Sequence, residues 1–180
     1  MGVDKARLEL VGETLAARAV RILGAQFDRI IVITGDPVPF QGLPVELVAD
    51  PPERRDPMGA ILTGWEYAQP SSAFVAAVDM PGLDAGVIER FLDVAASYAG
   101  VSIVAPVGVR GFEPLHALYR ESAIDVMRRR HAAGLRSLQG LVDAVAIERI
   151  PVAALAAGAW AFRSVNTPED CVQWENSAHG

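Results

Sequence analysis

The sequence predicts an α/β fold with a mostly parallel sheet flanked by helices. Two observations predict it: short apolar runs rich in β-branched residues, and segments with helical spacing between those runs. Buried strands separated by helices need crossover connections, which place strands in parallel and helices on both faces of the sheet. The 180 residues are enough for one compact domain, and we expect residues 1–180 to form it.

Helices and strands alternate in the first half of the chain. Apolar residues three and four positions apart predict helices over 13–27, 58–68 and 84–95. Continuous apolar runs predict strands at 29–34, 45–49 and 72–78, each followed closely by Gly, Asp or Pro. Because these runs do not alternate with polar residues, we expect strands that are buried on both faces.

The second half is less regular. We expect a strand at 101–106, a turn at 107–114, a short apolar stretch at 115–119 and helices near 122–132 and 137–143. Late strands are expected at 145–149 and 160–165. Thr167 then has the position of an N-cap, with Pro168 first and Asp170 third in a final helix.

The composition excludes several classes of protein. A net charge of −6 argues against nucleic-acid binding, and no apolar window is long enough to span a bilayer. Charged residues from Asp4 to Glu9 stand where a signal peptide would be apolar, so we expect a cytoplasmic protein. The single cysteine, Cys171, is expected to be structural. The basic run 128–131 is expected to be a solvated helix face.

Candidate functional residues follow the predicted strands, since ligands of such sheets bind at the carboxyl ends of the strands. Asp50 follows the strand at 45–49, and Asp79 follows the strand at 72–78. Arg110 and Glu113 follow the strand at 101–106. An aspartate at a strand tip can bind a cation such as Mg²⁺, or it can organise the following Met-Pro-Gly turn. The residues alone leave both roles open for Asp79.

Five segments together resemble the molybdenum cofactor guanylyltransferase family, nucleotidyltransferases that resemble molybdopterin-guanine dinucleotide biosynthesis protein A. In chain order they are MGVDKARLEL, VADPPERRDPMGAILTG, VAAVDMPGL, EPLHALYR and VNTPED. The resemblance covers nearly the whole chain. It implies a Rossmann-like nucleotide-diphospho-sugar transferase fold and a reaction that moves GMP from GTP to molybdopterin, with Mg²⁺ as cofactor and release of pyrophosphate. It also implies acceptor molybdoenzymes and a second copy of the chain as partners.

The resemblance assigns roles to individual residues. Lys5 matches the lysine that contacts the nucleotide phosphates, and Asp79 matches the metal-binding aspartate, so these two are the implied catalytic and nucleotide-binding pair. Asp50 matches the aspartate near the nucleoside. Asn166 matches the asparagine of the NTP turn, which implies a place on the substrate side.

Three further positions of interest lie in the matched segments. Gly59 falls on the family's Gly-Pro-Leu-x-Gly turn, where backbone N–H groups face an anion, and it is the last nucleotide-binding candidate. Asp56 stands where that pattern has its first glycine, which departs from the family. His116 lies inside an apolar run, and we expect it to be a core residue without a chemical role.

The N-terminus departs most from the family. There, a buried strand and a loop of the form Leu-Ala-Gly-Gly-x-Ser-x-Arg precede the Met-Gly with which this sequence begins. We therefore expect the first strand of the sheet to be missing. We also expect the codons before Met1 to encode such a strand, a Gly-Gly turn and an arginine.

Alternative functions stay open at this point. One is cytidylyl transfer or sugar-nucleotide transfer, because no single side chain here must recognise guanine. The other is a catalytically weak module that binds a pterin or a nucleotide without the triphosphate loop. Steady release of pyrophosphate distinguishes an enzyme from a binding module, and competition between GTP and CTP distinguishes the nucleotides.

Overall fold

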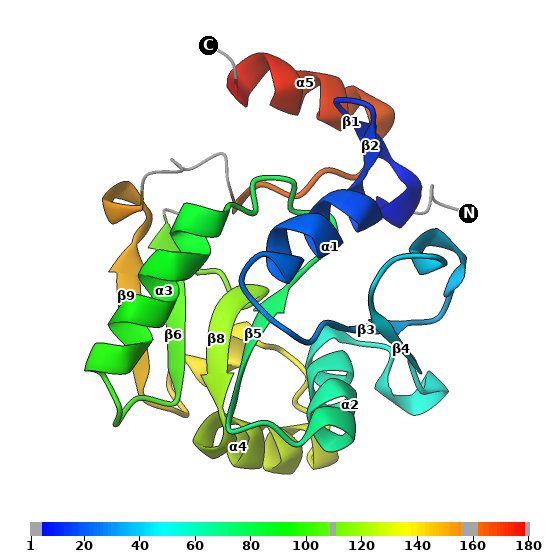
Figure 1. Cartoon of the computed structure of the whole chain (residues 1–180). Helices are drawn as coiled ribbons and strands as arrows, with labels where there is room; N and C mark the ends of the chain where they lie inside the picture. Colours follow the sequence, from blue (N-terminus) through cyan, green and yellow to red (C-terminus); the bar gives the residue numbers. More distant parts are fainter. Residues whose placement is uncertain (1–4, 109–110, 156–161, 179–180) are drawn as a thin grey trace.

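The structure is a computed structural model that describes residues 5–108, 111–155 and 162–178. Its larger sheet contains β5 (Ser72–Ala76), β8 (His116–Arg120), β6 (Ile103–Gly108), β7 (Gly111–Phe112) and β9 (Ile147–Pro151). β8 lies between β5 and β6, and both β7 and β9 pair with β6. A separate sheet contains β3 (Ile31–Thr34) and β4 (Glu46–Ala49). Figure 1 shows the two sheets side by side.

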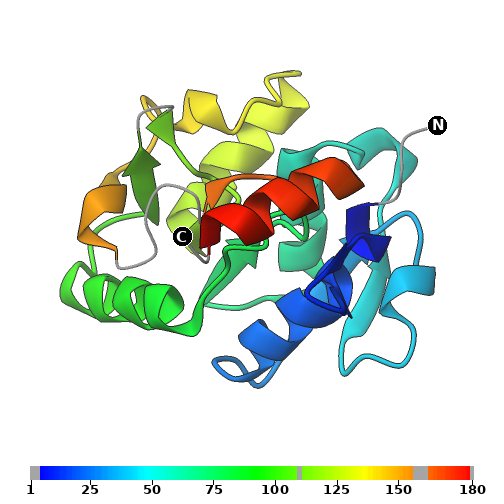
Figure 2. The same ribbon diagram turned by 90° about the horizontal axis from the view of Figure 1, so that it is seen from above.

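Five α-helices surround these strands in the part of the chain that the structure describes: α1 (Leu15–Gly24), α2 (Pro57–Ala68), α3 (Ala85–Ser97), α4 (Glu121–Ala132) and α5 (Pro168–Ala178). Near the N-terminus, β1 (Glu9–Leu10) and β2 (Glu13–Thr14) form a small hairpin. Short 3₁₀ turns cover Lys5–Arg7 (η1), Val38–Phe40 (η2), Pro52–Arg54 (η3), Gln139–Leu141 (η4) and Val152–Ala154 (η5). In Figures 1 and 2, α5 lies at the same end of the molecule as β1, and the two are in contact.

The predicted α/β class is confirmed, with one refinement to the sheet. β3 and β4 are parallel, as are β6 and β9, whereas β8 is antiparallel to both β5 and β6. The sequence indicates only an apolar stretch at 115–119, without the direction of a strand. The connection between β6 and β8 is too short for a crossover helix, so the chain can only return in the antiparallel direction. The sheet is therefore mixed.

Polar caps set the starts of the helices. Thr14 Oγ1 accepts a hydrogen bond from the Ala17 N–H at 3.2 Å, so α1 starts two residues later than predicted. The Asp170 N–H donates to Thr167 Oγ1 at 3.1 Å, which confirms the predicted start of the last helix. The expected helix at 137–143 contains only the turn η4. Of the expected strand at 160–165, residues 160–161 lie outside the described residues and 162–165 form no strand.

Two apolar clusters cover the faces of the larger sheet. Side chains of α2 and α4 pack on one face, against Ile103 and Tyr119. Side chains of α3 pack on the other, against Val104 and Leu118. Neighbouring residues of one strand thus point to opposite faces, as a pleated strand requires. No helix in the described ranges 5–108, 111–155 and 162–178 has the length and apolar character needed to cross a membrane.

An apolar cavity of about 920 Å³ separates the two sheets. Residues of β3 line one side of it and residues of β5 the other, with side chains of α1 and α2 above and below. Among the described residues, β3 pairs only with β4 and β5 pairs only with β8. Each of these two strands therefore has one edge without a neighbouring strand.

Candidate functional site

An ion pair joins the beginning of the described chain to the tip of β5. Lys5 Nζ lies 2.7 Å from Asp79 Oδ2, across 74 positions of sequence. The Lys5 side chain is 43% exposed and that of Asp79 is 16% exposed. The pair therefore fixes a positive and a negative group at the carboxyl end of β5, with the ammonium accessible from solvent. It brings together the two residues that the resemblance names as catalytic.

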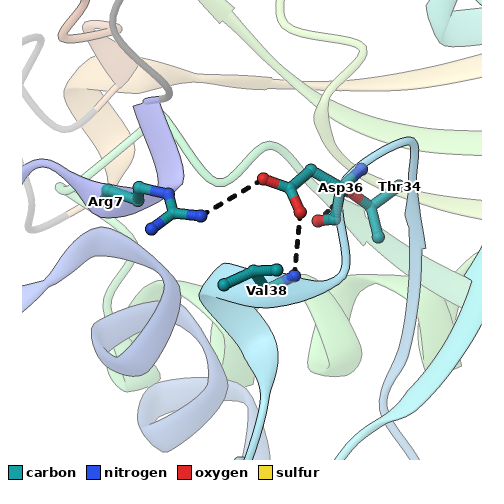
Figure 3. A network of polar contacts seen from close by, with 4 residues as sticks. All are labelled: Arg7, Thr34, Asp36 and Val38. Atoms are coloured by element: carbon teal, nitrogen blue, oxygen red, sulfur yellow. Dashed lines mark hydrogen bonds and ion pairs between the residues drawn. The ribbon is translucent and has the colours of Figure 1, made fainter.

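A second polar network lies beside this pair, at the carboxyl end of β3 (Figure 3). Arg7 Nη2 donates to Asp36 Oδ2 at 3.3 Å, and the Val38 N–H donates to Asp36 Oδ1 at 3.0 Å. Thr34 Oγ1 accepts from the Asp36 N–H at 3.1 Å and shapes the turn. The Val38 N–H, together with Arg7, lowers the pKa of Asp36. Because Lys5 and Arg7 belong to the same short turn, that turn contacts residues after both β3 and β5.

Asp50 follows β4 at the same end of its sheet. Its N–H donates to the Thr34 carbonyl at 3.0 Å, which holds it next to the carboxyl end of β3. Asp50 Oδ1 is buried and has no hydrogen-bond partner in the part of the chain that the structure describes. Buried carboxylate oxygens are normally hydrogen-bonded, so this oxygen is suited to accept a bond from a bound molecule.

Asn166 is held beside Asp79 through its neighbour. The Val165 N–H donates to the Asp79 carbonyl at 2.8 Å, so the turn before α5 runs past the tip of β5. The Asn166 N–H donates in turn to Asp170 Oδ2 at 2.8 Å. This bond fixes the backbone of Asn166 while its side chain is exposed. Lys5 thus contacts Asp79 directly, and Asn166 is connected to Asp79 through Val165.

Gly59 lies in the first turn of α2, and its surroundings differ from an anion site. Its N–H donates to Asp56 Oδ1 at 2.9 Å, so the Asp56 carboxylate caps the helix at the place where an anion would bind. A Cβ at position 59 would overlap the backbone of Arg54, which explains the glycine by packing. His131 Nε2 lies 3.1 Å and Arg136 Nη1 3.4 Å from Asp56 Oδ2.

These contacts decide the charge of Asp56. Burial raises the pKa of Asp56, but the Gly59 N–H and His131 lower it more, so its net pKa is below the usual value. The carboxylate therefore stays ionised and repels a phosphate at this helix end. The departure from the family pattern at Asp56 has a visible structural effect.

Asp79, the expected metal ligand, is not part of a cluster of protein metal ligands in the part of the chain that the structure describes. Within residues 5–108, 111–155 and 162–178, no group of three or more His, Cys, Asp or Glu side chains gathers to hold a metal ion. Mg²⁺ is commonly bound by one or two carboxylates, with substrate phosphates and water completing its octahedron. The Asp79 carboxylate lies at a strand tip beside Lys5, which is suited to bind phosphate. This arrangement fits a Mg²⁺ site that substrate phosphates and water complete.

The remaining residues that the sequence analysis singled out are now placed in the structure, or lie outside the described residues. His116 is fully buried among Phe74, Phe91 and Phe162, as expected of a core residue. Cys171 is buried against the N-terminal hairpin. In the basic run, Arg128 and Arg129 are exposed as expected, whereas His131 is partly buried against Asp56. Arg110 lies outside the described residues.

Arg7 and Asp36 were not among the residues predicted from the sequence. Asp36 stands in the TGDP segment two residues after β3, so the rule that directed attention to Asp50 and Asp79 applies to it equally. Arg7 had no comparable indication, because only the fold brings its short turn to the end of β3.

Comparisons with known proteins identify similar sequences and similar structures. The family model for the MobA-like NTP transferase domain matches residues 1–161. A probable molybdenum cofactor guanylyltransferase of Chloroflexus aggregans is 34% identical over 151 residues, which cover 80% of this chain and 71% of that protein. One from Opitutus terrae is 33% identical over 176 residues, which cover 94% of this chain and 86% of that protein.

Solved structures share the fold at lower identity. Molybdopterin-guanine dinucleotide biosynthesis protein A from Archaeoglobus fulgidus has a TM-score of 0.79 at 23% identity, covering 98% of this chain and 91% of its own. The 2-C-methyl-D-erythritol 4-phosphate cytidylyltransferase of Thermus thermophilus has a TM-score of 0.73 at 16% identity, with both chains fully covered. At these identities the structures support the fold alone. With the family model matching most of its length, the chain belongs to the MobA-like NTP transferase domain family, a family of nucleotidyltransferases.

Proposed function

We propose that this protein transfers GMP from GTP to molybdopterin, forming the guanine dinucleotide cofactor and pyrophosphate. The observation that carries the proposal is the Lys5–Asp79 pair at the carboxyl end of β5. Such an edge is where ligands bind in sheets of this class, and the pair offers one group for phosphate and one for a cation. The curated relatives named as guanylyltransferases support the choice of substrates.

The proposed reaction is an in-line displacement at phosphorus. An oxygen of the terminal phosphate of molybdopterin forms a new P–O bond to the α-phosphorus of GTP. The bond between the α-phosphorus and the bridging oxygen breaks, and pyrophosphate leaves with that electron pair. Because the nucleophile is already an anion, the protein's task is to position two anionic substrates and neutralise their charge.

Lys5 has the exposure and the bonding capacity for this task. An ammonium group has three N–H donors, and the contact with Asp79 uses one of them. The side chain is 43% exposed, which leaves the remaining donors accessible to a phosphate. Asp79 holds the ammonium in place, so Lys5 needs little reorganisation when the nucleotide binds.

Asp79 also serves the proposed cation. Its carboxylate would hold Mg²⁺, which when bound supplies positive charge to phosphate oxygens. The unpartnered Asp50 Oδ1 is proposed to accept a hydrogen bond from the nucleoside. Asn166, anchored beside Asp79, is proposed to contact the pterin substrate. Gly59 receives the least support as a nucleotide ligand, because its N–H is bonded to Asp56.

The test is Asp79→Asn, assayed by pyrophosphate release with GTP, molybdopterin and Mg²⁺. We expect turnover to fall by about 10²–10⁴-fold, the scale lost with a principal electrostatic stabiliser. Asp125→Asn is the matched control, because it breaks an exposed ion pair of similar geometry, with Arg128 Nη1 at 3.0 Å from Asp125 Oδ1. Its activity should equal that of the parent within twofold or so.

Three outcomes contradict the proposal in different ways. Activity of Asp79→Asn within a few-fold of the parent, with an unchanged melting temperature, would remove Asp79 from the chemistry and leave it as a turn former. Faster turnover with CTP than with GTP would make the protein a cytidylyltransferase. Tight binding of GTP and molybdopterin without any release of pyrophosphate would make it a binding module.

A further inference from the structure

The segment that carries Asp79, here called the Asp79 turn (residues 79–83), is held from two sides. On one side, the Val165 N–H donates to the Asp79 carbonyl at 2.8 Å. On the other side, Arg18 Nε on α1 donates to the Pro81 carbonyl at 2.9 Å. Residues 80–83 are buried, and a buried carbonyl needs a hydrogen-bond partner. Arg18 supplies that partner for Pro81.

Arg18 also contacts the C-terminal helix. The guanidinium carbon of Arg18 lies 5.6 Å from the centre of the Trp174 ring, within the range of a cation–π contact. Trp174 is a buried residue of α5 and belongs to the same apolar cluster as Val165. Both bonds that hold the Asp79 turn therefore come from residues that pack against Trp174. A single side chain of α1 connects the Asp79 turn to α5.

Arg18 and Arg21 lie almost one turn apart on α1 and have different surroundings. Arg21 is exposed, and its Nε and Nη2 donate to the Glu13 carboxylate at 3.0 and 2.9 Å. Arg18 is partly buried, and this burial is the largest of the effects that lower its pKa. Removing a guanidinium from water costs free energy, which the contacts with a carbonyl and an aromatic face offset. The surroundings of Arg18 thus suit a fixed side chain, and Arg21 offers a matched control.

We propose that Arg18 is a positioning residue of the transfer reaction, which holds the Asp79 turn so that the Asp79 carboxylate stays beside Lys5. Pro81 stands only two residues after Asp79, so a displacement of its carbonyl moves the carboxylate as well. The contact between Lys5 Nζ and Asp79 Oδ2 is only 2.7 Å long. A misplacement of about 1 Å at a reacting group can cost about 100-fold in rate. The inference rests on the proposed function, because it assumes that Asp79 takes part in the transfer.

Two substitutions separate the hydrogen bond of Arg18 from its charge. Glutamine Nε2 stands the same number of bonds from Cα as arginine Nε, so Arg18→Gln keeps an N–H donor for the Pro81 carbonyl and loses the charge. Arg18→Met keeps a similar length and has no N–H donor. Arg21→Met is the control, because it removes an exposed guanidinium from the same helix. All measurements are made below the melting temperature of the least stable variant.

The first measurement is amide hydrogen exchange in the absence of substrates. The Leu83 N–H donates to the Met80 carbonyl at 3.2 Å, so it reports opening of the Asp79 turn, as does the Val165 N–H. Arg18→Met should speed the exchange of both amides by roughly tenfold, whereas Arg18→Gln and Arg21→Met should stay within about threefold of the parent. Unchanged exchange in Arg18→Met would overturn the proposal. Equal acceleration in Arg18→Gln would overturn the role of the bond to Pro81, and equal acceleration in Arg21→Met would show only a loosened α1.

The second measurement is pyrophosphate release at increasing Mg²⁺ concentration. Arg18→Met should lower kcat by roughly 10- to 100-fold and raise the Mg²⁺ concentration needed for half-maximal turnover, because the carboxylate is misplaced. Arg18→Gln should restore most of both values. A lower kcat with the Mg²⁺ dependence of the parent would mean only a loss of active protein, and it would overturn the positioning role. Faster exchange with parental turnover would overturn it as well.

The two measurements keep this inference distinguishable from the proposed function. A parent protein that releases no pyrophosphate would contradict the guanylyl transfer. The exchange comparison uses no substrate, so it would still decide whether Arg18 holds the Asp79 turn. A parent that turns over, with no difference in exchange between Arg18→Met and Arg21→Met, would leave the transfer intact and overturn the role of Arg18.

Discussion

The two sheets have strands of similar composition and very different burial. β6 and β8 are almost wholly buried, with Ile103 and Tyr119 inaccessible to solvent. The equally apolar residues of β3 are all only partly buried, and so are most of those in β5. The difference lies in the neighbours within the sheet, since β6 and β8 each have strands on both sides and β3 and β5 have one open edge.

This comparison distinguishes two kinds of contact: helices that pack on the faces of a strand, and strands that pair along its edges. A continuous apolar run predicts that helices cover both faces of a strand, and α1 and α2 do line the cavity beside β3 and β5. It does not predict which strands pair with it in the plane of the sheet. Polar contacts join the two sheets at both ends of the cavity. At one end, the turn that contains Lys5 and Arg7 contacts Asp79 after β5 and Asp36 after β3. At the other end, Arg29 donates to the Ala68 carbonyl.

The largest expected effect is a difference in the free energy of unfolding between alanine variants of two isoleucines, one from each sheet. Ile103→Ala on β6 removes a fully buried side chain, and we expect it to lower the free energy of unfolding by about 2–5 kcal/mol. Ile33→Ala on β3 removes a partly buried one beside Gly64, and we expect a loss of less than about 2 kcal/mol. Denaturant titration of both variants gives the comparison directly.

The next effect concerns the pH dependence of stability and His116, which is buried in β8 of the larger sheet. Burial lowers the pKa of His116 from 6.5 to about 4, and neither ring nitrogen has a hydrogen-bond partner among the described residues. Between those pH values the unfolded chain binds a proton at His116 that the folded chain does not. Stability should therefore fall as the pH falls from 6.5 to about 4, by about 3 kcal/mol from this group.

His116→Phe isolates that contribution, since three phenylalanine rings already surround the site. Unfolding measured from pH 7 to pH 4 should show a shallower loss in the variant than in the parent. An identical dependence of stability on pH in the two proteins would mean that His116 gains a proton in the folded protein. Water or an anion would then have to reach the core around His116.

How far the sequence predicted the structure differs between the two halves. Apolar spacing and capping residues located α2, α3 and α5 closely, because these features are local. The antiparallel direction of β8 was missed, since it depends on the length of a connection and on the strands available to pair. The helix expected at 137–143 was wrong, since this segment contains only the short 3₁₀ turn η4 between α4 and β9.

The candidate site shows the same division. The carboxyl ends of predicted strands led to Asp50 and Asp79, and the resemblance led to Lys5 and Asn166. The contact of Arg7 with Asp36 required the fold, because it joins two turns that no local pattern relates. The capping of Gly59 by Asp56 was visible only as a departure from a pattern, and its consequence depended on His131 and Arg136 lying nearby.

The smallest effect concerns the N-cap of α3, the helix that packs on β6 and β8. Asp84 Oδ1 accepts from the Gly86 and Val87 N–H groups at 2.9 and 3.3 Å, at the start of α3. Asp84→Ala leaves these two donors without their partner, and we expect a loss of about 1 kcal/mol, whereas Asp84→Asn keeps an acceptor and should cost only a few tenths. Thermal melts of both variants measure this difference. Because α3 packs on β6 and β8, the loss from Asp84→Ala should add to the loss from Ile33→Ala on the separate sheet of β3 and β4. A combined loss that differs clearly from the sum would show that the two sheets are not energetically independent.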